Sequence, residues 1–369
     1  MRSYHIIIGS KSFFEQSIKR TDVYDKACYF LDLIKEADAA KQKGVNFSHN
    51  ADVLILKNDN YHGIVETAHD RLGPIIEELT TEDAEIFIHN PPRVLREFLD
   101  ELYNRNEIEL KEEKEHYIIE RDASKFVSNI KEISTHIFGQ ELAIEDISKT
   151  MWYLTSVERK KPYVVMLYGN SSLGKTELVR EIAHYFFGGR FLEKHLSMFK
   201  NMNYADYFFG DQPNRKSMGF DLLERESNLI FYDELDKCPE HFYSAFYTLF
   251  DNTTFKDSTY DVDTSGIMIV LTSNYQSIDE MKANLGLPIF YRIDKMIHFD
   301  DFSTEDIYRI AMNEIESRKS EYEGKLTPDR VYAAVSPHIE VKGENARTIK
   351  YKVQQVIEDL LFQEVEEQL

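Results

Sequence analysis

The loop from Gly169 to Thr176 restricts the fold of this chain more than any other segment. It reads GNSSLGKT, which fits the spacing GxxxxGK[ST], and it stands between the apolar run Tyr163 to Tyr168 and the helical pattern Glu177 to Phe187. Its glycines let the backbone bend so that N–H groups and the next helix N-terminus surround a phosphate. A chance Gly/Ser turn is the alternative, but the flanking strand and helix argue against it. We therefore predict a phosphate-binding loop.

Two further apolar runs, Leu229 to Tyr232 and Ile267 to Thr272, lack polar alternation, as does Tyr163 to Tyr168. Such runs are typical of central parallel strands that are covered on both faces. Because a helical pattern separates each run from the next, the predicted fold class is α/β, with a doubly wound parallel sheet. From Thr304 onward the pattern is helical only, which predicts a C-terminal helical lid.

Polar residues follow the predicted strands where a bound phosphate would need them. Within the loop, Lys175 is suited to neutralising phosphate charge and Thr176 to binding Mg²⁺. The run LIFYDE ends in Asp233, which can hold the magnesium shell, and Glu234, which can polarise an attacking water. Asn274 follows the third run and can hold that water. Taken singly, the acids are better explained as solvated turn residues, and the asparagine is explained equally well as a turn residue.

Two arginines are candidates for contacting a phosphoryl group. Arg292 lies in FYRID, and a guanidinium suits the spread charge of a phosphoryl transition state, so it can act across a subunit boundary. The alternative is a surface ion pair with Asp294 or Asp300, which is the commoner fate of a single arginine. Arg347, in GENARTIK, begins the last predicted helix and can reach the same site from the lid.

The first 120 residues alternate short apolar runs with helical stretches and predict a separate, small α/β unit. The charged stretch Glu107 to Glu115 is followed by Tyr117-Ile118-Ile119, which we interpret as an edge hairpin. We expect three domains: residues 1–122, an N-terminal α/β domain; residues 123–300, a large α/β nucleotide-binding subdomain; and residues 301–369, a helical lid.

Composition narrows the functions that we expect. A formal net charge of -21 disfavours tight non-specific binding to nucleic acid and favours protein partners. Apolar runs are far shorter than the roughly 20 residues that cross a bilayer, and the N-terminus lacks a signal-peptide core. The two cysteines, Cys28 and Cys238, fit neither a disulfide framework nor a metal cluster. We expect a soluble cytoplasmic protein that does not bind membranes.

In order along the chain, these segments resemble the AAA+ ATPases of the Clp unfoldase type, over roughly residues 133 to 368. Phe138-Gly139-Gln140 resembles the family's segment beside adenine, and LIFYDELDK its Walker B strand after the Walker A loop. IMIVLTSN resembles the sensor 1 stretch, IFYRIDKMIHF the arginine-finger segment, and Gly343 to Arg347 the sensor 2 segment.

The resemblance implies an ATPase that uses ATP and Mg²⁺. Catalytic roles then fall on Glu234, Asn274 as sensor 1, Arg292 as a finger acting in trans, and Arg347 as sensor 2. Magnesium falls to Thr176 and Asp233. Nucleotide contacts are implied for the following residues: Phe138, Gly139, Gly169, Asn170, Ser171, Ser172, Leu173, Gly174, Lys175, Thr176 and Glu177. A finger that works in trans implies a homo-oligomer, and the family usually forms hexameric rings.

One segment departs from the family. Where relatives carry a pore-loop aromatic that grips polypeptide, Phe209 to Phe220 reads FGDQPNRKSMGF, with Arg215 and Lys216 in place of that aromatic. The leading hypothesis is an ATPase that remodels a protein partner selected by the N-terminal domain. The missing aromatic favours a second, a nucleotide-gated oligomeric scaffold that recruits an effector. The basic pair prompts a third, a DNA remodeller, which the overall charge opposes.

Overall fold

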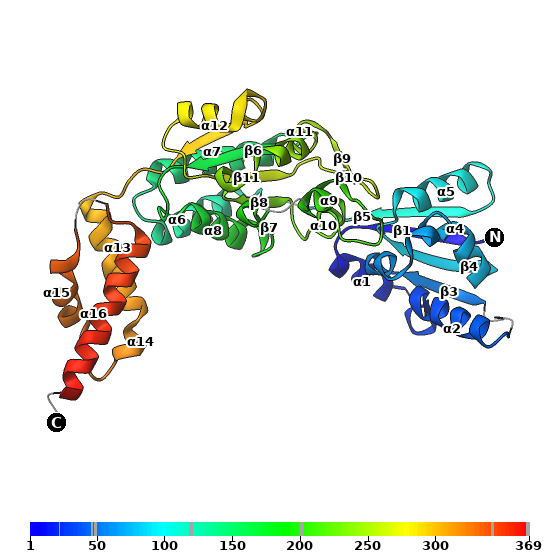
Figure 1. The fold of residues 1–369 in the computed structure, drawn as a ribbon, viewed down its shortest axis with the longest axis horizontal. Helices are drawn as coiled ribbons and strands as arrows, with labels where there is room; N and C mark the ends of the chain where they lie inside the picture. The colour runs from blue at the N-terminus through cyan, green and yellow to red at the C-terminus, as the bar shows by residue number, and fades with distance from the viewer. Residues whose placement is uncertain are drawn as a thin grey trace.

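The computed structural model of the chain describes residues 1–21, 23–45, 47, 50–117, 121–199, 203–340 and 343–366. These residues form three bodies along an arc, with the N-terminal unit at one end and a helical bundle at the other (Figure 1). Separate hydrophobic clusters fill the three bodies. The fold is α/β with a parallel sheet and a helical lid, as predicted. In the part of the chain that is described, no helix is both long and apolar enough to span a bilayer.

The N-terminal unit contains a five-stranded parallel sheet in the order β2-β3-β4-β1-β5. Its strands are β1 (Ser3–Ile8), β2 (Cys28–Tyr29), β3 (Ala51–Leu56), β4 (Thr80–His89) and β5 (Glu109–Lys114). Its helices are α1 (Lys11–Lys19), α2 (Phe30–Gln42), α3 (Glu66–His69), α4 (Leu72–Leu79) and α5 (Arg93–Asn104). Alternate residues of the strands point to opposite faces, so Ile6 packs in the cluster under α2, α4 and α5, whereas Ile7 packs under α1.

The edge of this sheet corrects the sequence interpretation. The charged run ELKEEK itself forms β5, which pairs in parallel with β1 and exposes most of its side chains. Charges on an exposed edge strand discourage pairing with another chain. Ile118 and Ile119 of the expected hairpin lie outside the described residues.

The central body contains a second five-stranded parallel sheet, in the order β12-β6-β11-β8-β7. Its strands are β6 (Tyr163–Tyr168), β7 (Leu192–His195), β8 (Leu229–Asp233), β11 (Met268–Thr272) and β12 (Lys295–His298), beside a hairpin of β9 (Thr254–Lys256) and β10 (Asp261–Asp263). Its helices are α6 (Ala123–His136), α7 (Glu141–Ser156), α8 (Lys175–Phe187), α9 (Asn203–Phe209), α10 (Met218–Leu223), α11 (Tyr243–Asp251) and α12 (Ile278–Phe290). The three predicted central strands are β6, β8 and β11, and both faces of each are buried.

The lid is a bundle of α13 (Thr304–Ser317), α14 (Lys319–Tyr322), α15 (Pro328–Val335) and α16 (Ala346–Glu366). Its first helix begins with a capping box, in which the Ser303 hydroxyl accepts from the Asp306 N–H and the Asp306 carboxylate accepts from the Ser303 N–H. At the start of α15, just before Pro328, the Thr327 hydroxyl accepts from the Arg330 N–H. The lid core is formed by the inward faces of α13, α15 and α16.

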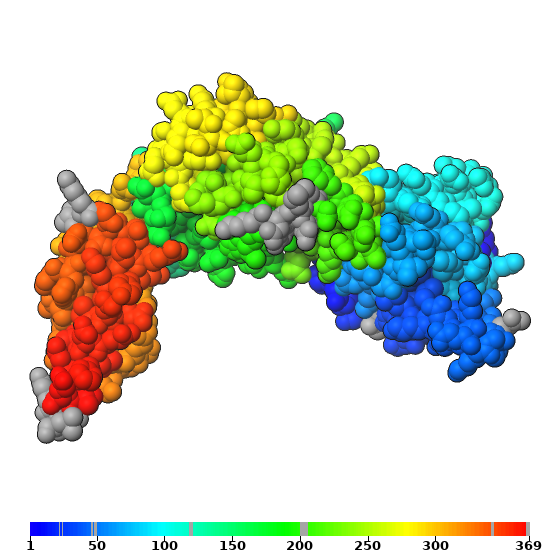
Figure 2. All heavy atoms as spheres, in the orientation of Figure 1, coloured from blue at the N-terminus to red at the C-terminus, as the bar shows by residue number. Residues whose placement is uncertain are grey.

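The N-terminal unit is pressed against the central body, and Figure 2 shows the two in contact at the blue-to-green boundary. The contact is polar, with a buried centre around Asn58 and Tyr260. Asn58 donates from Nδ2 to Glu224 at 2.7 Å and accepts from the Tyr260 hydroxyl at 3.3 Å, and both Asn58 and Tyr260 are 1% exposed. Arg93 pairs with Asp261 at 2.8 Å, and Tyr117 donates to the Arg225 carbonyl at 2.7 Å.

Candidate functional site

The predicted phosphate loop joins β6 to α8, as its sequence context requires. Gly169 has φ +133°, and a side chain there would place its Cβ 2.5 Å from the Phe299 carbonyl oxygen. Gly174 caps α8 at φ +98°. Both positions need the conformational freedom of glycine, because residues with a side chain rarely adopt these φ angles. The loop therefore presents its backbone and the helix N-terminus to one cavity.

Lys175 begins α8 and is 7% exposed. Its ammonium donates to the carbonyls of Gly169 at 2.7 Å and Asn170 at 2.6 Å, and it lies 3.5 Å from the Asn274 side-chain oxygen. Burial lowers the pKa of Lys175 to about 8, although the Asp236 and Asp233 carboxylates oppose that shift. A cation held among carbonyls at the mouth of this loop is positioned to bind an anion.

The two predicted acids lie at the end of β8. In the sheet, β11 lies between β8 and β6, the strand that leads into the loop. Asp233 accepts from the Thr176 hydroxyl at 3.4 Å and 3.5 Å, and it is contacted by Thr272 and by His195. Glu234 has φ +60°, in the left-handed region that costs a non-glycine residue about 1–2 kcal/mol. The two acids are adjacent in sequence but have different surroundings. Asp233 lies among hydroxyl groups, whereas Glu234 lies on a strained turn.

Asn274 follows β11, and Arg347 lies at the first turn of α16 in the lid. Asn274 donates to Asp236, from Nδ2 to Oδ2 and from its backbone N–H to Oδ1, at 3.3 Å in both cases. The lid reaches the loop directly, since the Ala346 N–H donates to the Ser172 carbonyl at 3.2 Å.

Most of these groups border one cavity of about 780 Å³. Of the predicted residues, those lining it are Phe138, Ser171, Ser172, Leu173, Gly174, Lys175, Thr176, Glu177, Asp233, Glu234, Asn274 and Arg347. Gly169 and Asn170 do not line it, but their carbonyls hold Lys175. Gly139 does not line it either: at φ +66° it forms a turn against Asp306, where a Cβ would lie 2.7 Å from the carboxylate.

Comparisons with known proteins agree with this geometry. The family described as AAA domain (Cdc48 subfamily) matches residues 160–322. The chaperone protein ClpB of Chlamydia caviae is 23% identical over 349 residues, covering 82% of this chain and 40% of that protein. ClpB of Mycoplasmoides gallisepticum is 20% identical over 277 residues, covering 67% of this chain and 38% of that protein. The human mitochondrial disaggregase is 26% identical over 161 residues, covering 39% of this chain and 22% of that protein.

Residues 160–322 match the AAA domain, and the chain resembles the Clp-type AAA+ chaperones over this segment. The chain spans about two fifths of the length of the ClpB relatives that it matches. We call the central body and the lid together the AAA+ module from here on.

Arg292 lies outside the cavity of the AAA+ module. Its guanidinium pairs with Asp251 at 2.6 Å, donates to the Pro288 carbonyl at 2.6 Å and lies 4.6 Å from the Tyr247 ring centre. The alternative partners that the sequence suggested are therefore wrong. Asp294 instead accepts from Arg159 and from the Val164 N–H. A role for Arg292 in a neighbouring subunit stays a prediction.

Several residues that line the cavity or contact its lining were not found from the sequence. Thr272 and Asp236 lie inside segments whose family likeness was recognised, so their polar side chains were the available signal. Glu314, Asn313 and Lys350 reach the cavity from lid helices, and His136 from α6, and no local pattern marks them. His195 ends β7 next to Asp233 because β7 and β8 pair in register there.

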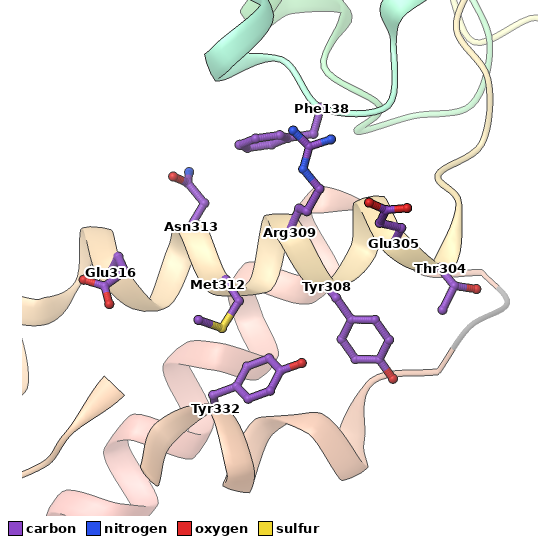
Figure 3. Close-up of a pocket in the computed structure, with 9 residues that line it drawn as sticks. All are labelled: Phe138, Thr304, Glu305, Tyr308, Arg309, Met312, Asn313, Glu316 and Tyr332. Carbon is purple, nitrogen blue, oxygen red and sulfur yellow. The ribbon is translucent and has the colours of Figure 1, made fainter. Parts of the chain in front are cut away.

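A second hollow of about 800 Å³ lies on the lid, against α13 and α15. Figure 3 shows Arg309 over the ring of Phe138, with Tyr308, Met312 and Tyr332 on the neighbouring surface. Phe138 and Asn313 border both this hollow and the cavity beside the phosphate loop.

Proposed function

We propose that this chain is an ATPase that couples the hydrolysis of Mg²⁺-bound ATP to the remodelling of a protein partner. The observation that supports it best is the convergence of Lys175, the Asp233–Glu234 pair and Arg347 on one cavity. The loop after β6, the end of β8 and the lid supply these groups, and their chemistry matches phosphoryl transfer. The likeness to ClpB and to a mitochondrial disaggregase favours a protein partner.

The cavity fits a nucleotide and its metal ion. Its volume is within the usual range of 300–1,000 Å³ for ligand sites. Thr176 and Asp233 offer hydroxyl and carboxylate oxygens, which are the donors that Mg²⁺ prefers, and they lie within 3.5 Å of each other. Mg²⁺ bound there would neutralise charge that develops on the phosphates.

Each side chain then has one task. Lys175 would bind the phosphates, and burial keeps competing water away from its ammonium. Glu234 would accept the proton of the attacking water, and Asn274, held by Asp236, would orient that water. Arg347 would contact the terminal phosphate from the lid. Arg292 would complete the site of a neighbouring protomer in a ring, which we propose to be hexameric.

We further propose that the chain works as three units, with boundaries near residues 122 and 300, and that the N-terminal unit selects the partner. Its buried polar contact with the AAA+ module supports a role in transmitting the nucleotide state.

Phosphate release by the purified chain tests the proposal. We expect Mg²⁺-dependent turnover that increases per chain with protein concentration, because ring assembly completes each site. Lys175→Ala should lose ATP binding, whereas Glu234→Gln should bind ATP and lose turnover by a factor of about 100 or more. Wild-type turnover no higher than that of Lys175→Ala, with candidate partners present, would contradict the proposal.

A nucleotide-gated scaffold is the second candidate, and one contact favours it. Lys216, in the segment that replaces the pore-loop aromatic, pairs with Asp59 of the N-terminal unit at 3.2 Å and lies 4.6 Å from the ring centre of Phe220. The His62 ring of the same unit lies 4.7 Å from the Phe220 ring. A segment engaged in this way is less available to grip polypeptide. A scaffold predicts that Glu234→Gln still supports the cellular function, whereas loss of function in that variant supports the remodelling ATPase.

A further inference from the structure

Thr272 stands between the two acids of the candidate site. It is the last residue of β11, it lines the cavity, and it is 2% exposed. The register pairs Leu271 with Tyr232, so the next residue of each strand, Thr272 and Asp233, lie side by side. The register of β11 against β8 therefore places the Thr272 hydroxyl beside the Asp233 carboxylate.

One hydroxyl contacts both acids at once. Its proton is donated to Oδ1 of Asp233, and its oxygen accepts the N–H of Glu234 at 3.0 Å. The first bond holds the carboxylate next to the Thr176 hydroxyl, which lies 3.5 Å from Oδ1 and 3.4 Å from Oδ2. The second holds the backbone of Glu234 in its left-handed conformation at φ +60°, where a non-glycine residue needs support from its surroundings.

We propose that Thr272 is a positioning residue that sets Asp233 for Mg²⁺ and Glu234 for water activation. This inference rests on the proposed function, because it concerns the same site. Groups that orient a metal ligand through a hydrogen bond affect metal binding without touching the metal. Valine has the shape of threonine without the hydroxyl, and serine keeps the hydroxyl without the methyl group.

The experiment measures ATP affinity with Mg²⁺ and with a chelator in the full chain, for the wild type and for Thr272→Val, Thr272→Ser and Thr264→Val. Thr264 is the matched control: it is 0% exposed, its hydroxyl donates to the Asn252 carbonyl at 2.9 Å, and it does not line the cavity. We expect Thr272→Val to lose about 10–100-fold of the affinity gained from Mg²⁺, and a similar factor in turnover. Affinity measured in chelator should stay at the wild-type level, because the loop itself is unchanged. Thr272→Ser and Thr264→Val should keep the Mg²⁺ gain.

A merely structural role for Thr272 predicts a different result. Thr272→Val and Thr264→Val would then both lower thermal stability and leave the Mg²⁺ gain intact, which would overturn the inference. Equal damage in Thr272→Ser and Thr272→Val would overturn it as well. A wild-type chain that does not bind ATP would overturn both the inference and the proposed function, whereas an intact Mg²⁺ gain in Thr272→Val would overturn the inference alone.

Discussion

The carboxyl edges of the two parallel sheets are built alike but end differently. Each has a glycine directly after a central strand, Gly9 after β1 and Gly169 after β6, and each glycine leads toward a helix N-terminus. At the central sheet these elements border a cavity of about 780 Å³. At the N-terminal sheet they are covered by the AAA+ module, and the polar residues there are almost completely buried: Ser10, Asn58, His89 and Asn90.

The group that closes the N-terminal edge is the Glu224 carboxylate. It accepts from Asn58 and from the Lys11 N–H near the start of α1, and burial raises its pKa. His89 lies 3.7 Å from it, but burial lowers the pKa of His89 to about 4, so the imidazole is neutral near pH 7 and does not form an ion pair. Its Nε2 lies 2.9 Å from the Gly9 carbonyl.

Open α/β sheets bind ligands outside the carboxyl ends of their strands. The comparison teaches that the same edge can serve two purposes in one chain. At the edge of the central sheet, which we call the open edge, the space beyond the strands is left for a ligand. At the edge of the N-terminal sheet, the closed edge, that space holds a carboxylate from the neighbouring body. The N-terminal unit is therefore expected to contact its partner through other surfaces.

Alanine at the two equivalent glycines tests whether the two sheet edges are independent. At both positions φ is positive, and a Cβ would lie 2.5 Å from an atom that cannot easily move: the Phe299 carbonyl oxygen at Gly169 and the Glu115 Cβ at Gly9. We expect Gly169→Ala and Gly9→Ala each to lower the free energy of unfolding by about 1–3 kcal/mol. Calorimetry measures this loss. ATP titration should show weaker binding for Gly169→Ala only, and weaker binding in both variants would mean that the two edges are not independent.

Removing the Glu224 carboxylate tests whether it holds the contact at the closed edge. Glu224→Ala leaves the buried Asn58 amide without its acceptor, which costs about 1–3 kcal/mol. Hydrogen exchange of the backbone amides of His89, Asn90 and Arg93 and of residues 257–260 should then become about tenfold faster or more. Glu226→Ala is the control, because the Glu226 side chain is 47% exposed and contacts Arg190 at 3.7 Å. Exchange as slow in Glu224→Ala as in that control would show that the carboxylate does not hold the contact.

Much of the open edge could be predicted from the sequence, because its signals are local. A strand, a glycine loop and a helix follow one another within a short segment. Asp233 ends a buried strand, Glu234 follows it, and Asn274 lies two residues after another buried strand. Gly139 was placed in the cavity by family likeness, but its positive φ serves a turn beside the lid helix instead. Its predicted role in nucleotide binding has no contact with the cavity to support it.

The closed edge and the arginine contacts could not be predicted in the same way. Asn58 and Glu224 are 166 positions apart, and Arg292 and Asp251 are 41 apart. No periodicity relates such residues, since the packing of whole bodies brings them together. The β5 strand was missed for a different reason: as an exposed edge strand it carries charges on both faces and lacks the apolar pattern of the other strands.

The smallest expected effect concerns the charge at the open edge. Burial lowers the pKa of Lys175 to about 8, so its ammonium loses its proton as the pH rises through that value. Only the protonated form attracts phosphate, hence ATP affinity should fall on the order of tenfold from about pH 7 to about pH 9 and level off at lower pH. Isothermal titration at several pH values measures this dependence. Lys175→Arg, which stays protonated throughout, should give a flat profile whatever its absolute affinity. A flat profile for the wild type would show that the ammonium keeps its proton over this pH range. Water would then solvate the ammonium more than its burial indicates.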